Sequence, residues 1–343
     1  MDRATERAGV PVPGAGRVAW MDAVRGTAII LLLLYHCTAI PQTLGMPSPT
    51  LLRWFSAFFM PYRMPTLMVL SGMLLARSLR KPLSDYYAGK VAGVVWPYLV
   101  WVVIAKLVWL DAVGEPWWEW RAWYATSYLW FLFFLGCYYL IAPALRALPV
   151  WFPVAVTWLL AVLLVQGSVE QRLAYFAVFF FAGNALAAGP RLVERLTPRY
   201  RLRLYGLLTV LFGVASVIWT MPLLYNPWFA PLSMAGGLLA IGLCRRAAGA
   251  GPVLRAVRFV GRTSLVYYVS HFPLMVAISM SLVGTLDPWS LAGVNLLAAG
   301  VTCTVLALAC RRAPWRWLFR APGSVSTAVA SGLRSAGVRL RTR

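Results

Sequence analysis

The first long apolar stretch of the chain reads Trp20-Met-Asp-Ala-Val-Arg-Gly-Thr-Ala-Ile-Ile-Leu-Leu-Leu-Leu-Tyr-His36. Its length and apolar content predict a transmembrane helix. Arg25 and His36 are eleven positions apart, and eleven helical residues make about three turns. The two side chains therefore share one face of the helix, about 16 Å apart along its axis. Because a histidine inside a bilayer is costly, we interpret His36 as a functional residue.

Similar apolar stretches recur along the whole chain. Apolar residues make up 61% of the sequence and charged residues 12%, against about 45–50% and about 25% in an ordinary soluble domain. We therefore predict an all-α, polytopic integral membrane protein with about ten transmembrane helices. The ten predicted spans are Val18–Ile40, Leu51–Ala76, Val91–Leu110, Ser127–Ala142, Val150–Val165, Gln171–Ala188, Leu202–Trp219, Trp228–Cys244, Ser264–Val283 and Ala292–Cys310.

The distribution of charge predicts the topology. The formal net charge is +22, but the basic residues are spread over many short loops instead of one soluble face, which disfavours nucleic acid as a partner. They concentrate in the N-terminal tail, the even-numbered loops and the C-terminal tail, as cytoplasmic segments do. We expect a basic cytoplasmic tail at 1–17, a ten-helix domain at 18–310 and a basic cytoplasmic tail at 311–343. The expected location is the inner (plasma) membrane, and we expect the last part of the C-terminal tail to be mobile against anionic lipid.

The third loop, Glu115–Tyr124, is rich in tryptophan. Such residues are typical of a membrane–water interface. The loop is either an interfacial belt or a rim that helps to hold an acceptor such as a sugar.

Few residues of the predicted membrane domain suit chemistry. The ten carboxylates all lie in tails, in loops or at span edges, which argues against a proton-coupled transporter. The sequence has no histidine–cysteine cluster with zinc spacing, no P-loop and no Gly-x-Ser-x-Gly elbow, so we expect no metal. What remains is His36, His271, Arg25 and Arg63. Arg63 stands between two prolines in the second span, which break the helical hydrogen-bond ladder and require protein or a cavity nearby to satisfy it. Arg63 either binds a polar or anionic ligand there or extends to the outer membrane interface.

Five short motifs make the chain resemble the acyltransferase-3 family of integral-membrane acyltransferases. They occur in family order, from about residue 18 to 142 and again from 262 to 275. The motifs are Asp22-x-x-Arg25-Gly26 followed by His36, Arg63-Met-Pro65 with Ser71-Gly72, Trp96-Pro97-Tyr98, Leu129-Trp130-Phe131-Leu132, and Tyr267-Tyr268 with His271-Phe272-Pro273. One departure concerns a pair of basic residues that the family often shows before the proline of the third span. Lys90 matches the first, but Gly93 occupies the second position, with Arg77 and Arg80 nearby as substitutes.

The resemblance implies transfer of an acyl group, usually acetyl, from cytoplasmic acyl-CoA to a hydroxyl of a sugar, glycoside or cell-surface glycan. It assigns catalysis to His36, and we interpret this residue as a general base, with an acyl-histidine intermediate as a less favoured variant. The hypothesis places Arg25, Arg77, Arg80 and Lys90 on acyl-CoA, because arginine suits phosphate. The residues expected to line the site are Arg63, Ser71, Trp130, Tyr268 and His271.

Two other interpretations remain open at this stage. A non-enzymatic transporter or flippase for a lipid-linked sugar would need neither His36 nor acyl-CoA. Another type of membrane-bound O-acyltransferase would use His271 with a polar partner such as Asn295 or Asn184. The polar partner that orients His36 is expected to be a hydroxyl or a backbone carbonyl.

Overall fold

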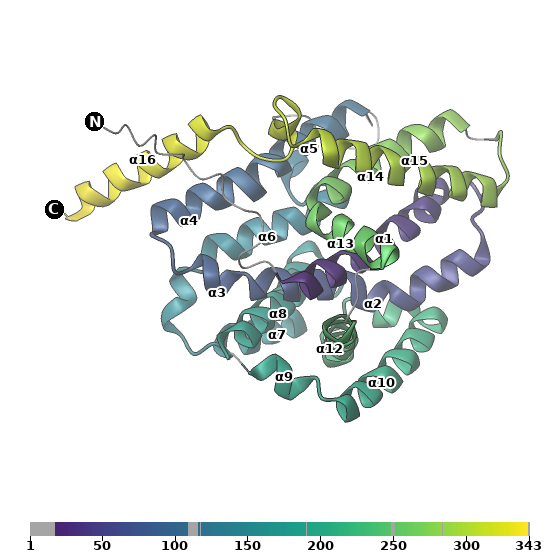
Figure 1. Cartoon of the computed structure of the whole chain (residues 1–343), viewed down its shortest axis with the longest axis horizontal. Coiled ribbons are helices and arrows are strands. Elements are labelled where there is room, and N and C mark those ends of the chain that lie inside the picture. The colour runs from purple at the N-terminus through teal and green to yellow at the C-terminus, as the bar shows by residue number, and fades with distance from the viewer. Residues whose placement is uncertain are drawn as a thin grey trace, which may run out of the picture.

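The structure is a computed structural model that describes residues 18–108, 116, 118–189, 191–247, 251–282 and 284–341, and these residues form helices and connecting turns without a strand (Figure 1). The predicted N-terminal tail, 1–17, lies outside the described residues.

All ten predicted spans are helical. The corresponding helices are α1 (Ala19–Thr43), α2 (Thr50–Met73), α4 (Leu83–Lys90) continuing through η1 (Val91–Val95) into α5 (Trp96–Val108), α6 (Trp130–Ile141), α7 (Phe152–Leu163), α8 (Val169–Ala188), α10 (Arg199–Ile218), α12 (Ala230–Arg246), α14 (Ser264–Leu282) and α15 (Pro288–Ala309). Among the described residues, seven helical segments are long and apolar enough to cross a membrane, and α6 and α7 are shorter apolar helices. The chain is therefore a multi-pass membrane protein.

Short helices connect these elements. They are α3 (Leu75–Ser78), η2 (Trp120–Trp123), η3 (Ser127–Leu129), η4 (Ala144–Ala147), α9 (Leu192–Leu196), α11 (Thr220–Leu223), η5 (Pro227–Phe229), α13 (Pro252–Arg262) and η6 (Trp315–Leu318).

The helix α1 lies at the centre of the fold. It packs against α2, α12, α13, α14 and α15 (Figure 1). The helix α2 in turn packs against α8, α10 and α12. The first two predicted spans therefore carry their polar residues into the interior of the helix bundle.

Glycines allow two pairs of helices to approach at backbone distance. A Cβ atom on Gly26 of α1 would meet the Val257 carbonyl of α13, and one on Gly183 of α8 would meet the Val69 carbonyl of α2. Small residues at such crossings let membrane helices pack closely. Gly26 of the Asp-x-x-Arg-Gly motif and Gly183, which follows the phenylalanines of α8, are thus explained by packing.

We expect Gly183→Ala to destabilise the protein by about 1–3 kcal/mol, because the new methyl group must push two backbones apart. Gly136→Ala in α6 is the matched control, since nothing lies within 4 Å of a Cβ at that position. Thermal unfolding in detergent should show a lower midpoint for Gly183→Ala and an unchanged or slightly higher one for Gly136→Ala. Equal midpoints would show that the α2–α8 crossing tolerates a larger separation.

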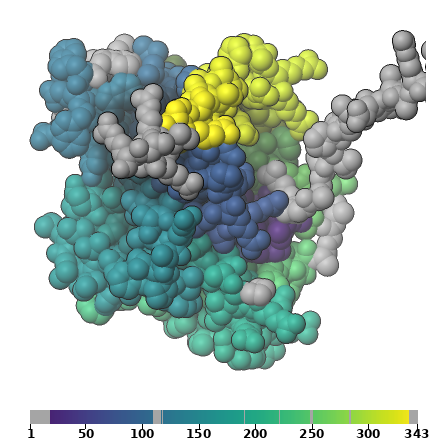
Figure 2. All heavy atoms as spheres, turned by 90° about the vertical axis from the view of Figure 1, so that its left-hand side faces the viewer, coloured from purple at the N-terminus to yellow at the C-terminus, as the bar shows by residue number. Residues whose placement is uncertain are grey.

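The C-terminal segment folds onto the bundle, which corrects our expectation of a mobile tail. The helix α16 (Gly323–Arg341) lies against α4, and in Figure 2 this yellow segment covers blue residues of that region. The indole nitrogens of Trp96 and Trp101 donate hydrogen bonds to the carbonyls of Trp317 and Leu318, at 2.7 and 2.9 Å. The indole of Trp101 is buried and its donor needs an acceptor, which the chain after α15 supplies.

Candidate active site

The two histidines of the chain contact each other. Nδ1 of His36 on α1 and Nε2 of His271 on α14 are 2.9 Å apart. His271 is fully buried, and its Nδ1 lies 2.7 Å from the Tyr267 carbonyl oxygen one turn earlier in α14. The sequence interpretation expected a hydroxyl or a carbonyl as the partner of His36. The Leu32 carbonyl, one turn earlier in α1, does act on the His36 ring, but the side-chain partner is the second histidine, which is itself bound to a carbonyl and was not expected.

The two hydrogen bonds of His271 determine which ring nitrogens carry protons when both histidines are neutral. A carbonyl oxygen only accepts, so Nδ1 of His271 carries the proton and Nε2 of His271 is an acceptor. Nδ1 of His36 must then donate to it. The remaining ring nitrogen, Nε2 of His36, is left with a free lone pair, as a general base requires.

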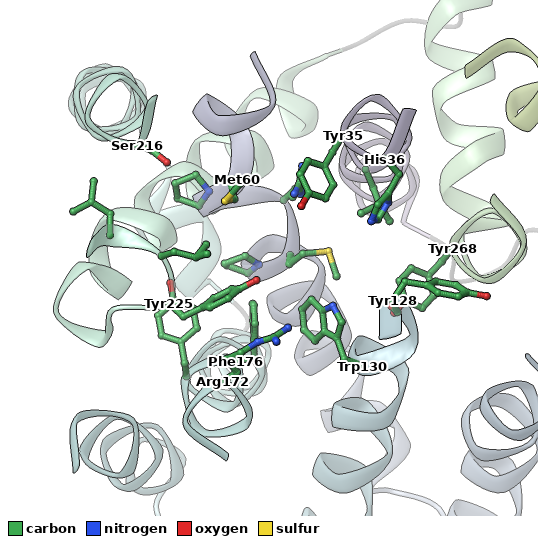
Figure 3. Close-up of a pocket in the computed structure, with 18 of the residues that line it drawn as sticks. Tyr35, His36, Met60, Tyr128, Trp130, Arg172, Phe176, Ser216, Tyr225 and Tyr268 are labelled. Atoms are coloured by element: carbon green, nitrogen blue, oxygen red, sulfur yellow. The ribbon is translucent and has the colours of Figure 1, made fainter. Parts of the chain in front are cut away.

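The ring of His36 lines a cavity of about 340 Å³, which we call the His36 cavity (Figure 3). Neither Asn184 nor Asn295 lines this cavity, and Asn295 donates instead to Ser279 at 2.9 Å. The residues of its wall are Leu32, Tyr35, His36, Met60, Pro61, Arg63, Met64, Pro65, Ser127, Tyr128, Trp130, Arg172, Tyr175, Phe176, Ser216, Leu223, Leu224, Tyr225, Tyr268 and Phe272.

Arg63 reaches this cavity from the proline-flanked part of α2. Its guanidinium lies 4.0 Å from the ring centre of Tyr35, the neighbour of His36. Arg63 is 6% exposed, and its Nε and Nη1 are buried without a hydrogen-bond partner. Pro61 leaves the Ala57 carbonyl without its usual helical partner, and the Ser216 hydroxyl donates to that carbonyl at 2.9 Å. The helix α2 continues through Pro61 and Pro65 without a break, and the part of it that carries Arg63 borders a cavity.

A second cavity, of about 300 Å³, contains Arg25 and is called the Arg25 cavity here. Ser71, Gly93, Tyr139 and Tyr268 also line it. Asp22 of the Asp-x-x-Arg-Gly motif forms an ion pair with Arg262 of α13 at 3.3 Å. This ion pair holds the start of α1, which carries Arg25, against α13. Gly93 lies in the π-helical turn η1, a distortion frequently found at functional sites.

Tyr268 of α14 is the residue that lines both cavities. Its hydroxyl donates to the Tyr128 carbonyl, and the Tyr128 hydroxyl donates to the Val269 carbonyl at 2.7 Å. The Tyr128 ring also stacks on Phe272, with ring centres 4.4 Å apart. These contacts fix α14, and with it His271, against the turn η3.

The structure brings most of the predicted site residues to these cavities. Arg63, Trp130 and Tyr268 line the His36 cavity, and Arg25 and Ser71 line the Arg25 cavity. The side chains of Arg77 and Arg80 are exposed and line neither.

Lys90 is half-buried and lies near the Arg25 cavity. Its Nζ is 3.6 Å from the ring centre of Tyr139, a residue of the Arg25 cavity, and 3.3 Å from Ser78 Oγ. Lys90 therefore stands beside the Arg25 cavity without forming its wall.

Most residues of the His36 cavity were not identified from the sequence, Arg172 and Tyr225 among them. Arg172 opens α8, and Tyr225 precedes η5. Arg172 lies beside one of the odd-numbered loops, which are poor in basic residues, and a basic residue at this place was the sequence signal available. Tyr225 carries no sequence signal, although its backbone φ of 56° is unusual for a residue other than glycine.

The family model described as "Acyltransferase domain" (Acyl_transf_3) matches residues 18–310. No curated protein and no solved structure matches the chain significantly. The matched range covers every helix that carries a residue of the two cavities. The chain therefore belongs to the acyltransferase-3 family and is a membrane acyltransferase of that family.

Proposed function

We propose that the protein transfers an acyl group, in the first place acetyl, from cytoplasmic acyl-CoA to a hydroxyl of a sugar, glycoside or cell-surface glycan. The observation that carries this proposal is the hydrogen-bonded histidine pair. It leaves Nε2 of His36 as a base at a 340 Å³ cavity, next to a second cavity that contains Arg25.

The two cavities suit the two substrates of such a transfer. The Arg25 cavity is lined by Gly93 and Ser264, which are close in sequence to the basic residues Lys90 and Arg262, and we assign it to the pantetheine arm of acyl-CoA. In this proposal Arg25, in the cavity wall, and Lys90, beside it, bind phosphate groups, while the exposed Arg77 and Arg80 bind the nucleotide outside it. The His36 cavity holds the acceptor. The wall at Tyr268, shared by both cavities, is where the thioester meets the hydroxyl.

The proposed reaction is a direct transfer. Nε2 of His36 takes the proton from the acceptor hydroxyl, and the hydroxyl oxygen forms a bond to the thioester carbonyl carbon. The carbon–sulfur bond then breaks, and the CoA thiolate takes the proton back from His36. Arg63, with two unpartnered buried nitrogens, supplies a fixed positive charge for the carbonyl oxygen as it becomes negative.

The role of Arg25 gives a test that needs no acceptor. Arg25→Ala should weaken acetyl-CoA binding about 10–100-fold, because hydrogen bonds to charged groups contribute about 1.5–3 kcal/mol. Titration of labelled acetyl-CoA into purified protein in detergent measures this change. Arg53→Ala, which removes an exposed arginine of α2 that lines neither cavity, is the control. Unchanged affinity in Arg25→Ala would contradict the assignment of this cavity to the donor.

A further inference from the structure

The wall of the His36 cavity carries more positive charge than the transfer of an acetyl group requires. Arg63 and Arg172 both line it, and no described residue of the wall is an aspartate or glutamate. Glu170, two positions before Arg172, is exposed and accepts a hydrogen bond from Tyr124 instead. Two positive charges in one partly enclosed cavity are unfavourable unless an anion enters.

The guanidinium of Arg172 is held against two aromatic rings of the cavity wall and does not extend freely from the protein surface. Its guanidinium lies 5.1 Å from the ring centre of Trp130 and 4.9 Å from that of Tyr225, and both rings line the same cavity. The buried Nε of Arg172 has no hydrogen-bond partner. A guanidinium kept between two rings still presents its planar set of N–H donors at the edge, where a carboxylate or phosphate binds.

Tyr225 does not provide the missing negative charge. Burial raises the pKa of its phenol, and this effect outweighs the nearby charges of Arg172 and Arg63. The phenol is therefore neutral at physiological pH and is a further hydrogen-bond donor. Its position is fixed by Gln171, whose Nε2 donates to the Tyr225 carbonyl at 2.8 Å.

We infer that the acceptor carries an anionic oxyacid group, a carboxylate or a phosphate, which binds Arg172 on the side of the cavity opposite His36. Figure 3 shows this arrangement, with Arg172 and Tyr225 across the cavity from His36 and with Trp130 between them. The inference rests on the proposed function and narrows its acceptor to acidic glycans, sugar acids and lipid-linked sugar phosphates. Neutral sugars without such a group would leave Arg172 without a partner.

The test analyses the product of the natural acceptor pool. Membranes from cells that naturally carry this chain are incubated with acetyl-labelled acetyl-CoA, and the labelled product is passed over an anion exchanger. We expect the label that depends on His36 to be retained. Phosphodiesterase followed by phosphatase would abolish its retention if the anion is a phosphate, and carbodiimide-coupled reduction of the carboxyl group to an alcohol would abolish it if the anion is a carboxylate. Label in a neutral product would overturn the inference and leave the proposed function intact, whereas absence of any His36-dependent label would contradict both.

Variants of Arg172 test whether this residue binds the anionic group of the acceptor. Arg172→Gln should raise KM for the acceptor about tenfold or more, and Arg172→Lys should recover part of the loss because it keeps the charge. Arg121→Gln removes an exposed arginine of η2 that lies over Trp120 and does not line the cavity, so it should behave as wild type. If Arg172→Gln leaves KM for the anionic acceptor unchanged, Arg172 does not bind the anion.

Discussion

His36→Ala should lower kcat for acyl transfer by about 10²–10⁴-fold, the contribution expected of a well-placed general base. The reason lies in the contacts of the ring. Nδ1 of His36 is engaged with His271 at 2.9 Å, so that Nε2 alone is available to take the acceptor proton at the cavity. No other histidine lines the His36 cavity in the described part of the chain. The rate is measured as the slow release of the CoA thiol from acetyl-CoA by purified protein, with water in place of the acceptor hydroxyl.

Binding of the donor separates this effect from misfolding. Because Arg25 lies in the other cavity, His36→Ala should bind acetyl-CoA with nearly wild-type affinity while turnover is lost. His36→Gln keeps a polar side chain of similar length but no basic nitrogen, so it should be as inactive as His36→Ala. Turnover of His36→Gln close to wild type would contradict the assignment of the base.

The second large effect concerns His271, which positions His36 and does not itself reach the cavity wall. His271→Ala leaves the Nδ1–H group of His36 without its acceptor and frees the ring to rotate. An unsatisfied buried donor costs about 1–3 kcal/mol, which corresponds to a loss of about 5–150-fold in kcat. We therefore expect His271→Ala to be impaired, but less than His36→Ala.

A conservative variant distinguishes positioning from a merely structural role. The side-chain oxygen of His271→Gln accepts a hydrogen bond, so this variant should recover part of kcat with KM for acetyl-CoA unchanged. If instead His271→Ala abolished turnover while His36→Ala retained it, the base would be His271. The structure argues against this, because both ring nitrogens of His271 already have partners and the ring is fully buried.

Much of the fold follows from the sequence. The apolar stretches place all ten helices, since long apolar runs in a membrane have no alternative to helix formation. Three of the ten predicted spans do not reach the length or apolarity of a full span. The helices α6 and α7 are short, and α8 begins with Glu170, Gln171 and Arg172.

The site was predictable only in part. The position of His36 follows from its place in an apolar helix, but its contact with His271 joins residues 235 positions apart, and no local pattern encodes such a contact. The same holds for Tyr225, whose place in the cavity depends on how α8 and η5 pack. Gly93 shows the reverse case. Gly93 stands where the family motif often has a basic residue, and it lines the Arg25 cavity. A longer side chain at this position would occupy space in the cavity.

The central claim is tested most directly by mixing purified wild-type, His36→Ala and His271→Ala protein with labelled acetyl-CoA and measuring donor binding and CoA release together. The account predicts binding by all three proteins, slow release of CoA by wild type with water in place of the acceptor, still slower release by His271→Ala and almost none by His36→Ala. Wild-type release by His36→Ala, or a failure of all three proteins to bind acetyl-CoA, would contradict it.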